Sequence, residues 1–246
     1  YNGPKIHKIS PNHGSTVGGT TVRIFGQDFG DTDHLPTVMI DDQVCPEIMW
    51  KSKELIVCST PAGWGTSKKV QVTVGDQSSR PGEVVFNYDP PEVFSVTPEV
   101  CPTRGKCLLR ISGANFGIEQ GDHLQVRVGG KTCANVGEGT APLYVNQTSL
   151  ECVVPGNVGK EQNVEVCVGS QCSTPNDIFS YRRPEVYEIR PRHGSLKGGG
   201  IATIIGVGFG QKGGASSVLV AKIGDVPCVD TKWLSDTRLE CTLPNS

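Results

Sequence analysis

One pattern occurs three times in this chain, and this repetition limits the possible folds more than any other feature. Each copy has a proline, a short alternating run, a second proline with a glycine-rich turn, another alternating run and a Gly-x-x-Phe-Gly corner. The three copies occupy residues 4–30, 91–117 and 184–210. The second prolines of successive copies are 87 and 93 residues apart. That period is too long for a solenoid unit and suits a small domain, so we expect tandem domains.

The segments between the turns have the periodicity of β-strands. Apolar and polar residues alternate over residues 70–74 and 164–168, and no run has apolar residues at helical spacing. In a strand, successive side chains point to opposite faces, so this alternation predicts strands that are buried on one side. Many short strands with frequent turns predict an all-β fold with one β-sandwich in each repeat.

The ends of the repeats predict where the domains begin and end. Tyr88 and Tyr181 stand three residues before the opening proline of the next copy, and Tyr1 stands three residues before Pro4. We therefore expect repeats at 4–88, 91–181 and 184–246, with residues 1–3 ending a preceding repeat. The third repeat is expected to stop before its last two strands. The linkers are short and contain proline, which stiffens a chain, so we expect an extended array.

Composition and charge exclude several functions. The chain has 246 residues and a formal net charge of −2, which gives no general attraction to nucleic acid. No apolar run approaches the ~20 residues of a membrane helix, so any membrane anchor is expected outside this segment. The sequence has no Gly-x-Ser-x-Gly elbow, and the glycines at 206–210 lack the helix of a phosphate-binding loop. We expect no enzyme activity, no catalytic residue, no metal and no cofactor.

The cysteines predict disulfide bonds in an oxidising compartment. Ten cysteines without a Cys-x-x-Cys pair favour bridges over the alternative of free buried thiols. One pair recurs at equivalent positions of every repeat, 13 residues apart in the first and third and 19 in the second, which has an insertion. This pattern predicts one bridge in each repeat, namely Cys45–Cys58, Cys133–Cys152 and Cys228–Cys241.

Four further cysteines belong to the second repeat alone. Cys101 and Cys107 replace residues at both ends of the glycine-rich turn, so they are expected to pair with each other. Cys167 and Cys172 flank a predicted hairpin, and Cys167 has the opposite parity to its apolar neighbours, which predicts an outward-facing cross-strand bridge. A zinc site is the alternative, but the typical ligand spacing with nearby histidines is missing.

The shared features of the copies resemble IPT/TIG domains. These features are the opening proline, the second proline with its Gly-Gly turn, the Gly-x-x-Phe-Gly corner and a Cys-x-x-Pro strand. IPT/TIG domains are immunoglobulin-like modules of plexins, hepatocyte-growth-factor-type receptors, fibrocystin and some transcription factors. The resemblance covers the whole chain, although the second repeat has Gly105-Lys106 in place of Gly-Gly. It implies tandem immunoglobulin-like sandwiches in an extended array.

The resemblance implies several functions, because one fold can carry many. The leading hypothesis is a non-enzymatic extracellular or cell-surface protein that acts in adhesion as a spacer or protein-binding stalk. Its partners would be other proteins, copies of itself or neighbouring repeats of a longer chain. A plexin-type signalling receptor ectodomain and an accessory segment of a carbohydrate-active enzyme are the alternatives. DNA binding, as in the transcription factors, is opposed by the net charge and the cysteines.

Two surface residues are candidates for contact or modification. Trp64 occurs only in the first repeat, within Ala-Gly-Trp-Gly-Thr, and is a candidate for an exposed contact. Asn146 begins the only Asn-x-Ser/Thr sequon of the chain, at a predicted polar turn, and is expected to carry a glycan.

Two sets of equivalent residues have competing interpretations. Each repeat has an aromatic residue eight positions before its second recurring cysteine, and these residues are Trp50, Tyr144 and Trp233. They could form a binding stripe, but packing against a disulfide is the favoured interpretation. His13 and His193 share a turn position beside a glycine, and we interpret them as exposed turn residues rather than as ligands of a metal.

Overall fold

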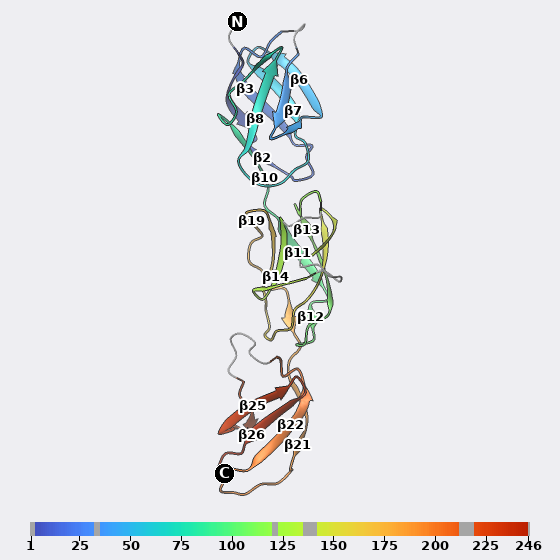
Figure 1. Ribbon diagram of the computed structural model, residues 1–246, viewed down its shortest axis with the longest axis vertical. Coiled ribbons are helices and arrows are strands. Elements are labelled where there is room, and N and C mark those ends of the chain that lie inside the picture. The colour runs from blue at the N-terminus through green and yellow to red at the C-terminus, as the bar shows by residue number, and fades with distance from the viewer. Residues whose placement is uncertain (1–2, 32–34, 120–122, 135–141, 212–218, 246) are drawn as a thin grey trace.

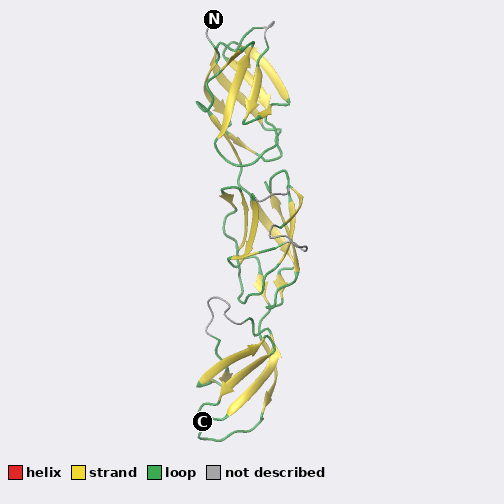
Figure 2. Cartoon of the chain, viewed as in Figure 1, coloured by secondary structure: helices red, strands yellow, loops and turns green. Residues whose placement is uncertain are grey.

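The computed structural model contains three strand-rich bodies in a line, with the two ends of the chain at opposite ends of the molecule (Figure 1). The structure describes residues 3–31, 35–119, 123–134, 142–211 and 219–245. These residues form strands and turns without a helix, and hence no helix that could cross a membrane (Figure 2). The predicted all-β fold of immunoglobulin-like sandwiches is confirmed. Tyr1, which we assigned to a preceding repeat, lies outside the described residues.

The first repeat is a two-layer sandwich. One sheet has the order β1-β3-β7-β6, and the other has the order β2-β10-β8-β4-β5 with β9 beside β8. Within this repeat the strands are β1 (Lys5–Ser10), β2 (His13–Gly14), β3 (Thr21–Gln27), β4 (Thr37–Ile40), β5 (Gln43–Val44), β6 (Glu47–Ser52), β7 (Leu55–Ser59), β8 (Lys68–Val74), β9 (Gln77–Ser78) and β10 (Val85–Tyr88).

The second repeat has the same arrangement. Its first sheet has the order β11-β13-β17-β16, its second has the order β15-β14-β18-β19, and β12 pairs with β20. The strands of this repeat are β11 (Glu92–Thr97), β12 (Val100–Cys101), β13 (Leu108–Ala114), β14 (Leu124–Val128), β15 (Lys131–Thr132), β16 (Leu143–Asn146), β17 (Ser149–Val153), β18 (Val164–Val168), β19 (Gln171–Cys172) and β20 (Ser180–Tyr181).

The third repeat keeps the first sheet in the order β21-β22-β26-β25 and adds the β23-β24 hairpin. Its strands are β21 (Glu185–Arg190), β22 (Ile201–Val207), β23 (Lys222–Ile223), β24 (Val226–Pro227), β25 (Asp230–Ser235) and β26 (Arg238–Thr242). Counterparts of β8 and β10 are absent from the described residues of this repeat. As a result Val186 is 63% exposed, whereas its equivalent Ile6 is 3% exposed.

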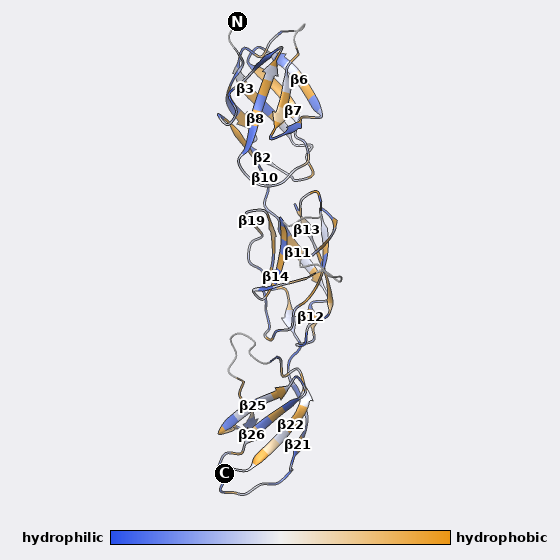
Figure 3. Cartoon of the chain, viewed as in Figure 1, coloured by the Kyte–Doolittle hydropathy of each residue, from blue (hydrophilic) through white to orange (hydrophobic). Residues whose placement is uncertain are grey.

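The alternating sequence builds the core between the sheets. In β3 every second side chain is buried, and Val22 and Ile24 are fully enclosed. Hydrophobic and hydrophilic residues both occur along the strands of the repeats (Figure 3). The strands β13 and β22 repeat this pattern at equivalent positions. Burying such side chains contributes roughly 1.5–3 kcal/mol each, so the alternation determines which face of each strand turns inward.

The Gly-x-x-Phe-Gly corner is a packed turn in all three repeats. Its phenylalanine is buried, and its first glycine lies against that ring and against the carbonyl oxygen of the opening strand. A Cβ at Gly26 would collide with the Lys5 oxygen and with Phe29. The third position of the corner has a positive φ, near 60° for Asp28 and Asn115, a conformation that Asn and Asp tolerate better than most residues.

A buried tyrosine closes each of the first two repeats. The Tyr88 hydroxyl donates to the Pro61 carbonyl oxygen at 2.9 Å, and the Tyr181 hydroxyl donates to that of Pro155 at 2.8 Å. Phe86 stands edge-on to Tyr88 in the same way as Phe179 does to Tyr181. Each tyrosine therefore joins the last strand of its repeat to the Cys-x-x-Pro segment.

Candidate functional site at the interfaces between repeats

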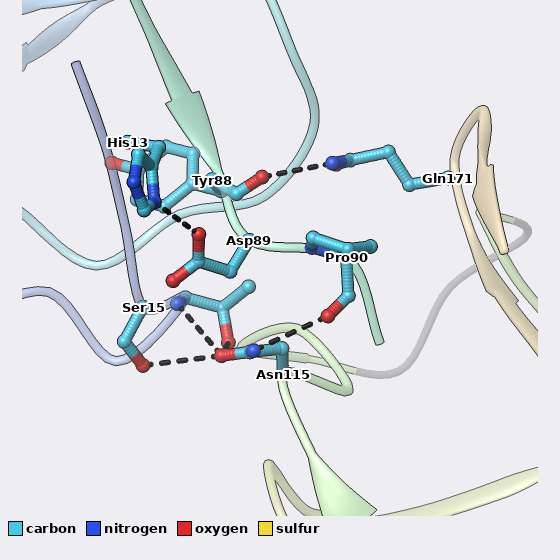
Figure 4. Close-up of polar contacts among 8 residues, drawn as sticks. His13, Ser15, Tyr88, Asp89, Pro90, Asn115 and Gln171 are labelled. Atoms are coloured by element: carbon cyan, nitrogen blue, oxygen red, sulfur yellow. Dashed lines mark hydrogen bonds and ion pairs between the residues drawn. The ribbon is translucent and has the colours of Figure 1, made fainter. Parts of the chain in front are cut away.

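The linker between the first two repeats is tied to the first repeat. The Asp89 N–H donates to the carbonyl oxygen of Gly14 at 2.8 Å, and the Asp89 carboxylate accepts from the ring Nδ1 of His13 at 2.7 Å (Figure 4). The next two residues, Pro90 and Pro91, restrict their own backbone. The path of the chain into the second repeat is therefore constrained on both sides of the linker.

Asn115 joins the corner of the second repeat to the first repeat. Its side-chain oxygen accepts from the Ser15 hydroxyl at 3.2 Å and from the Thr16 N–H at 3.3 Å (Figure 4). Its side-chain nitrogen donates to the Pro90 carbonyl oxygen at 3.2 Å. One amide thus contacts the turn of the preceding repeat and the linker at the same time.

Trp64 lies between the first two repeats. Its ring stacks on His123 with 4.4 Å between ring centroids and an interplanar angle of 5°. An added Cβ at Gly169 would lie 2.7 Å from the Trp64 ring, so this close approach requires glycine. The Lys68 Nζ is 5.3 Å from the centroid of the same ring. The structure therefore places Trp64 in a contact between repeats, where its ring is partly covered.

A third contact completes this interface. The side chain of Gln171, in β19, donates to the carbonyl oxygen of Tyr88 at 2.8 Å (Figure 4). The contacts of Asn115, Trp64 and Gln171 come from three different segments of the two repeats. Each of them would have to break before the first repeat could turn away from the second at that point.

The interface between the second and third repeats uses other side chains at the same place. Thr103 donates its hydroxyl to the Asp236 carboxylate at 2.5 Å, and the same carboxylate oxygen accepts from the Gly210 N–H at 2.9 Å. Gln211 lies directly on Gly156, where a Cβ would collide with its amide. The Gln211 amide also donates to the carbonyl oxygen of Arg104 at 3.4 Å.

The two interfaces share one architectural position. Thr16 and Thr103 are equivalent residues of the glycine-rich turn, and each is 1% exposed. In both cases the following repeat supplies the acceptor, an amide oxygen from Asn115 or a carboxylate oxygen from Asp236. Gly208 occupies the corner position of Asn115 in the third repeat and has no side chain, so Asp236 takes over that role.

Four of the five expected cysteine pairs are bonded in the structure. The bonded pairs are Cys101–Cys107, Cys133–Cys152, Cys167–Cys172 and Cys228–Cys241. Cys167 lies on the opposite face of β18 from Val166, as its parity indicates, and directly opposite Cys172. Cys167 is nevertheless only 7% exposed, which differs from the outward, solvent-facing position that we expected.

The Cys45–Cys58 pair departs from expectation. Both cysteines are free thiols in the structure, and both are buried. A hydrogen bond between them and burial together raise the pKa of Cys58 far above its usual value. Both residues still occupy the positions that are bridged in the other two repeats.

Three other candidates from the sequence are a metal site, the glycan site at Asn146 and the turn residue His193. In the part of the chain that the structure describes, the residues grouped closely enough for a metal ion are Glu165, Cys167 and Cys172, and the two cysteines are joined to each other. Asn146 is exposed at the end of β16, and its side-chain oxygen accepts from the N–H of Thr148 at 2.9 Å. His193 is exposed at the equivalent turn position of His13.

Two of the three equivalent aromatic residues, Tyr144 and Trp233, bind the carbonyl oxygen that ends the corner of their repeat. The Tyr144 hydroxyl donates to the Gly117 carbonyl oxygen at 3.0 Å, and the Trp233 indole donates to that of Gly210 at 3.2 Å. Both rings pack against core clusters that include the disulfide cysteines. Trp50 is half-buried, and its indole nitrogen has no partner among the described residues.

Sequence reasoning missed most residues of the interfaces. Asn115, His123, Gln171 and Asp236 were not singled out, because none of them belongs to a motif that carries chemistry. One signal was available for Asn115, since it stands in the repeated corner where the chain folds back toward the preceding repeat. The others lie in loops and a short strand whose positions depend on the orientation of whole repeats.

Comparison with known proteins identifies the type of domain in each repeat. Residues 4–88, 91–181 and 184–246 each match the IPT/TIG domain model. Fibrocystin-L of Homo sapiens is 30% identical over 245 residues, which cover 97% of this chain and 5% of that protein. Fibrocystin-L of Mus musculus is 29% identical, over 98% of this chain and 5% of that protein. The chain thus spans about a twentieth of the length of these relatives.

Comparison with solved structures finds similarities at low identity. The full extracellular region of plexin A4 is 18% identical, with a TM-score of 0.35 over 99% of this chain and 21% of that chain. The surface glycan-binding protein PbSGBP-B from Prevotella bryantii is 14% identical, with a TM-score of 0.47 over 72% of this chain and 42% of that chain. Because the family model matches all three repeats from residue 4 to residue 246, the chain belongs to the IPT/TIG domain family.

Proposed function

We propose that this chain is part of a non-enzymatic extracellular spacer that holds protein-binding surfaces at fixed distances along a stalk. The observation that carries this proposal is the pair of interfaces between repeats. Each of them joins a buried threonine of one repeat to a side chain of the next through hydrogen bonds. Because these contacts limit the movement of neighbouring repeats relative to each other, the two ends of the stalk stay at a defined distance and orientation.

Disulfides and relatives support an extracellular location. Bonds such as Cys133–Cys152 persist in oxidising compartments and are rare in the cytosol. The plexin A4 structure is described as an extracellular region, and PbSGBP-B as a surface protein. The chain therefore resembles modules that work outside the cell, and its repeated architecture suits a structural role.

Small-angle X-ray scattering of the chain in dilute solution tests the spacer. The longest strands have seven residues and span roughly 23 Å at about 3.3 Å per residue, so three repeats in line with their connecting turns reach ~70–100 Å. We expect a distance distribution with the long tail of an elongated particle and a maximum near that length. A compact, globular profile with the three repeats clustered would contradict the proposal.

A further inference from the structure

The outer face of the β1-β3-β7-β6 sheet differs in charge from the equivalent faces of the other repeats. Cross-strand partners lie on the same side of a sheet, so the printed register identifies the side chains that share this face. One row contains Arg23, Val57 and Met49, and the next contains Lys8, Phe25 and Leu55. We call this surface the basic face of the first repeat.

The basic face has cations without partners. Lys5, Lys8 and Arg23 are exposed, and among the described residues none of them lies within ion-pair distance of a carboxylate. Glu47 is the acidic residue of β6 at the edge of this face. The electrostatic potential of the face is therefore positive although the whole chain is slightly acidic.

The equivalent faces of the other repeats are internally paired. Arg110 occupies the position of Arg23, and it binds Glu151 of the neighbouring strand at 2.6 Å. In the third repeat Glu240 takes the position of Glu151 and binds Lys232 at 3.4 Å. The first repeat has Val57 at that position, so its central cation has lost the carboxylate that the other repeats provide.

An apolar strip crosses the middle of the basic face. Phe25 is 38% exposed and Met49 is 51% exposed. Val57 lies on β7, the strand between them, where it is the cross-strand partner of Arg23 and of Met49, and it is 8% exposed. Exposed aromatic and methionine side chains at the centre of a charged rim are typical of protein interfaces.

We propose that the basic face of the first repeat binds an acidic protein segment that places an apolar side chain between Phe25 and Met49. Carboxylates of the partner would take the place of Glu151 beside Arg23 and would also pair with Lys8. The apolar strip is the reason for choosing a protein, because a sulfated polysaccharide has no apolar side chain to bury there. This inference rests on the proposed role as a protein-binding stalk and adds where one partner binds and what its chemistry is.

A defined peptide probe tests the surface on the intact chain. The probe is a fluorescein-labelled decapeptide of glutamates with two central leucines, and its binding is followed by fluorescence anisotropy. We expect saturable binding that weakens as ionic strength rises, because salt screens exposed charges. A peptide with lysines in place of the glutamates, and one with serines in place of the leucines, should each bind more weakly.

Matched variants locate the binding site. The double variant Lys8→Gln, Arg23→Gln should weaken binding about tenfold, since two exposed ion pairs contribute at most ~1 kcal/mol each. Met49→Ser should weaken binding as well. Arg110→Gln, at the equivalent position of the second repeat, should leave binding unchanged. All three variants change exposed side chains, so their circular dichroism spectra should match that of the parent chain.

Several outcomes would overturn the inference. One is a glutamate peptide that binds no more tightly than its lysine counterpart. Another is binding that responds to Arg110→Gln as much as to the Lys8 and Arg23 changes. A third is a heparin oligosaccharide that binds more tightly than the peptide with an affinity that Met49→Ser does not alter. The peptide measurement is independent of the scattering profile, so failure of this site and failure of the spacer are distinguishable.

Discussion

At the scale of single residues, position 26 requires glycine because a larger side chain has no room there, and not because the backbone needs an unusual conformation. Replacing it with alanine would push a methyl group into the Lys5 carbonyl oxygen and the buried Phe29 ring. We expect Gly26→Ala to destabilise the first repeat by ~1–3 kcal/mol, the usual range for overpacking. Hydrogen exchange of the β1 and β3 amides measures this change repeat by repeat.

A second glycine provides the control for that substitution. Gly75 has a φ of 58°, and a Cβ there would meet nothing within 4 Å. Asparagine tolerates such a backbone conformation, so Gly75→Asn should leave exchange in β1 and β3 nearly unchanged. Equal protection in Gly26→Ala and Gly75→Asn would show that the close contact at the corner is unimportant.

Tyr88 predicts a dependence of stability on alkaline pH. Burial, followed by the electrostatic effects of Cys45 and Asp41, raises the pKa of Tyr88 from its usual value of about 10 to about 12. Because the folded-state pKa lies above the unfolded one, this contribution to stability is complete below pH 10 and is lost as the pH rises toward 12. Titration of phenolate absorbance should detect this late-titrating group.

The Tyr88→Phe variant separates the hydroxyl from the ring. It removes the hydrogen bond to Pro61, so the free energy of unfolding should fall by roughly 1–2 kcal/mol at neutral pH. The same variant should also lose one late step of the phenolate titration, while Tyr181, whose pKa is likewise about 12, continues to supply another. If Tyr88→Phe removed amplitude from the early step of the titration and left the late step unchanged, Tyr88 would titrate with the exposed tyrosines and the prediction would be wrong.

At the scale of elements, the interior face of β7 protects the two free thiols. Cys58 lies on β7, Cys45 lies just after β5, and both are buried. The raised pKa of Cys58 keeps its thiol protonated at neutral pH, and the thiolate is the reactive form. We therefore expect the folded, reduced protein to resist iodoacetamide at both cysteines, and mass spectrometry to find both alkylated after denaturation. Rapid labelling of the native protein would contradict this burial.

The end of β16 is expected to carry a glycan at Asn146. This strand is the edge of its sheet, and Asn146 and Thr148 are both exposed there, which leaves room for a bulky sugar. Protein secreted from a eukaryotic host should give a peptide around Asn146 whose mass falls on glycosidase treatment. Asn146→Gln is the control without the modification. An unmodified mass for the parent peptide would contradict the prediction.

At the scale of the whole molecule, the shape depends on a few side chains between repeats. Asn115→Ala removes the hydrogen bonds to Ser15, Thr16 and Pro90. We expect the angle between the first two repeats to vary more widely, with residual dipolar couplings of the two repeats averaged differently. The fold of each repeat should be unchanged, because Asn115 lies outside both cores.

The control for Asn115→Ala is a substitution at the equivalent corner position of the first repeat. Asp28 stands at the same corner position of the first repeat with the same positive φ, so Asp28→Ala introduces the same backbone strain. That variant should leave the angle between the first two repeats unaltered, because Asp28 lies at the other end of the first repeat. Equal broadening in the two variants would assign the effect to strain at the corner and not to the contact.

The sequence by itself determined the fold of each repeat, since alternation in β3 and the Gly26 corner are local features that recur in every copy. It also indicated the cysteine partners in the second and third repeats, because equivalent positions in homologous repeats lie at equivalent places in space. The free state of Cys45 and Cys58 could not be read in this way, because a bridge depends on the distance and orientation of the two side chains in the folded core.

Only the tertiary structure decided the interfaces and the basic face. Trp64 was identified as a contact residue, but its contact with His123 depends on the orientation of two repeats, which no local pattern encodes. The unpaired state of Arg23 likewise depends on the register between β3 and β7, which places Val57 beside it. Local periodicity determines which way a side chain faces, whereas its neighbour is set by how separate strands and repeats pack together.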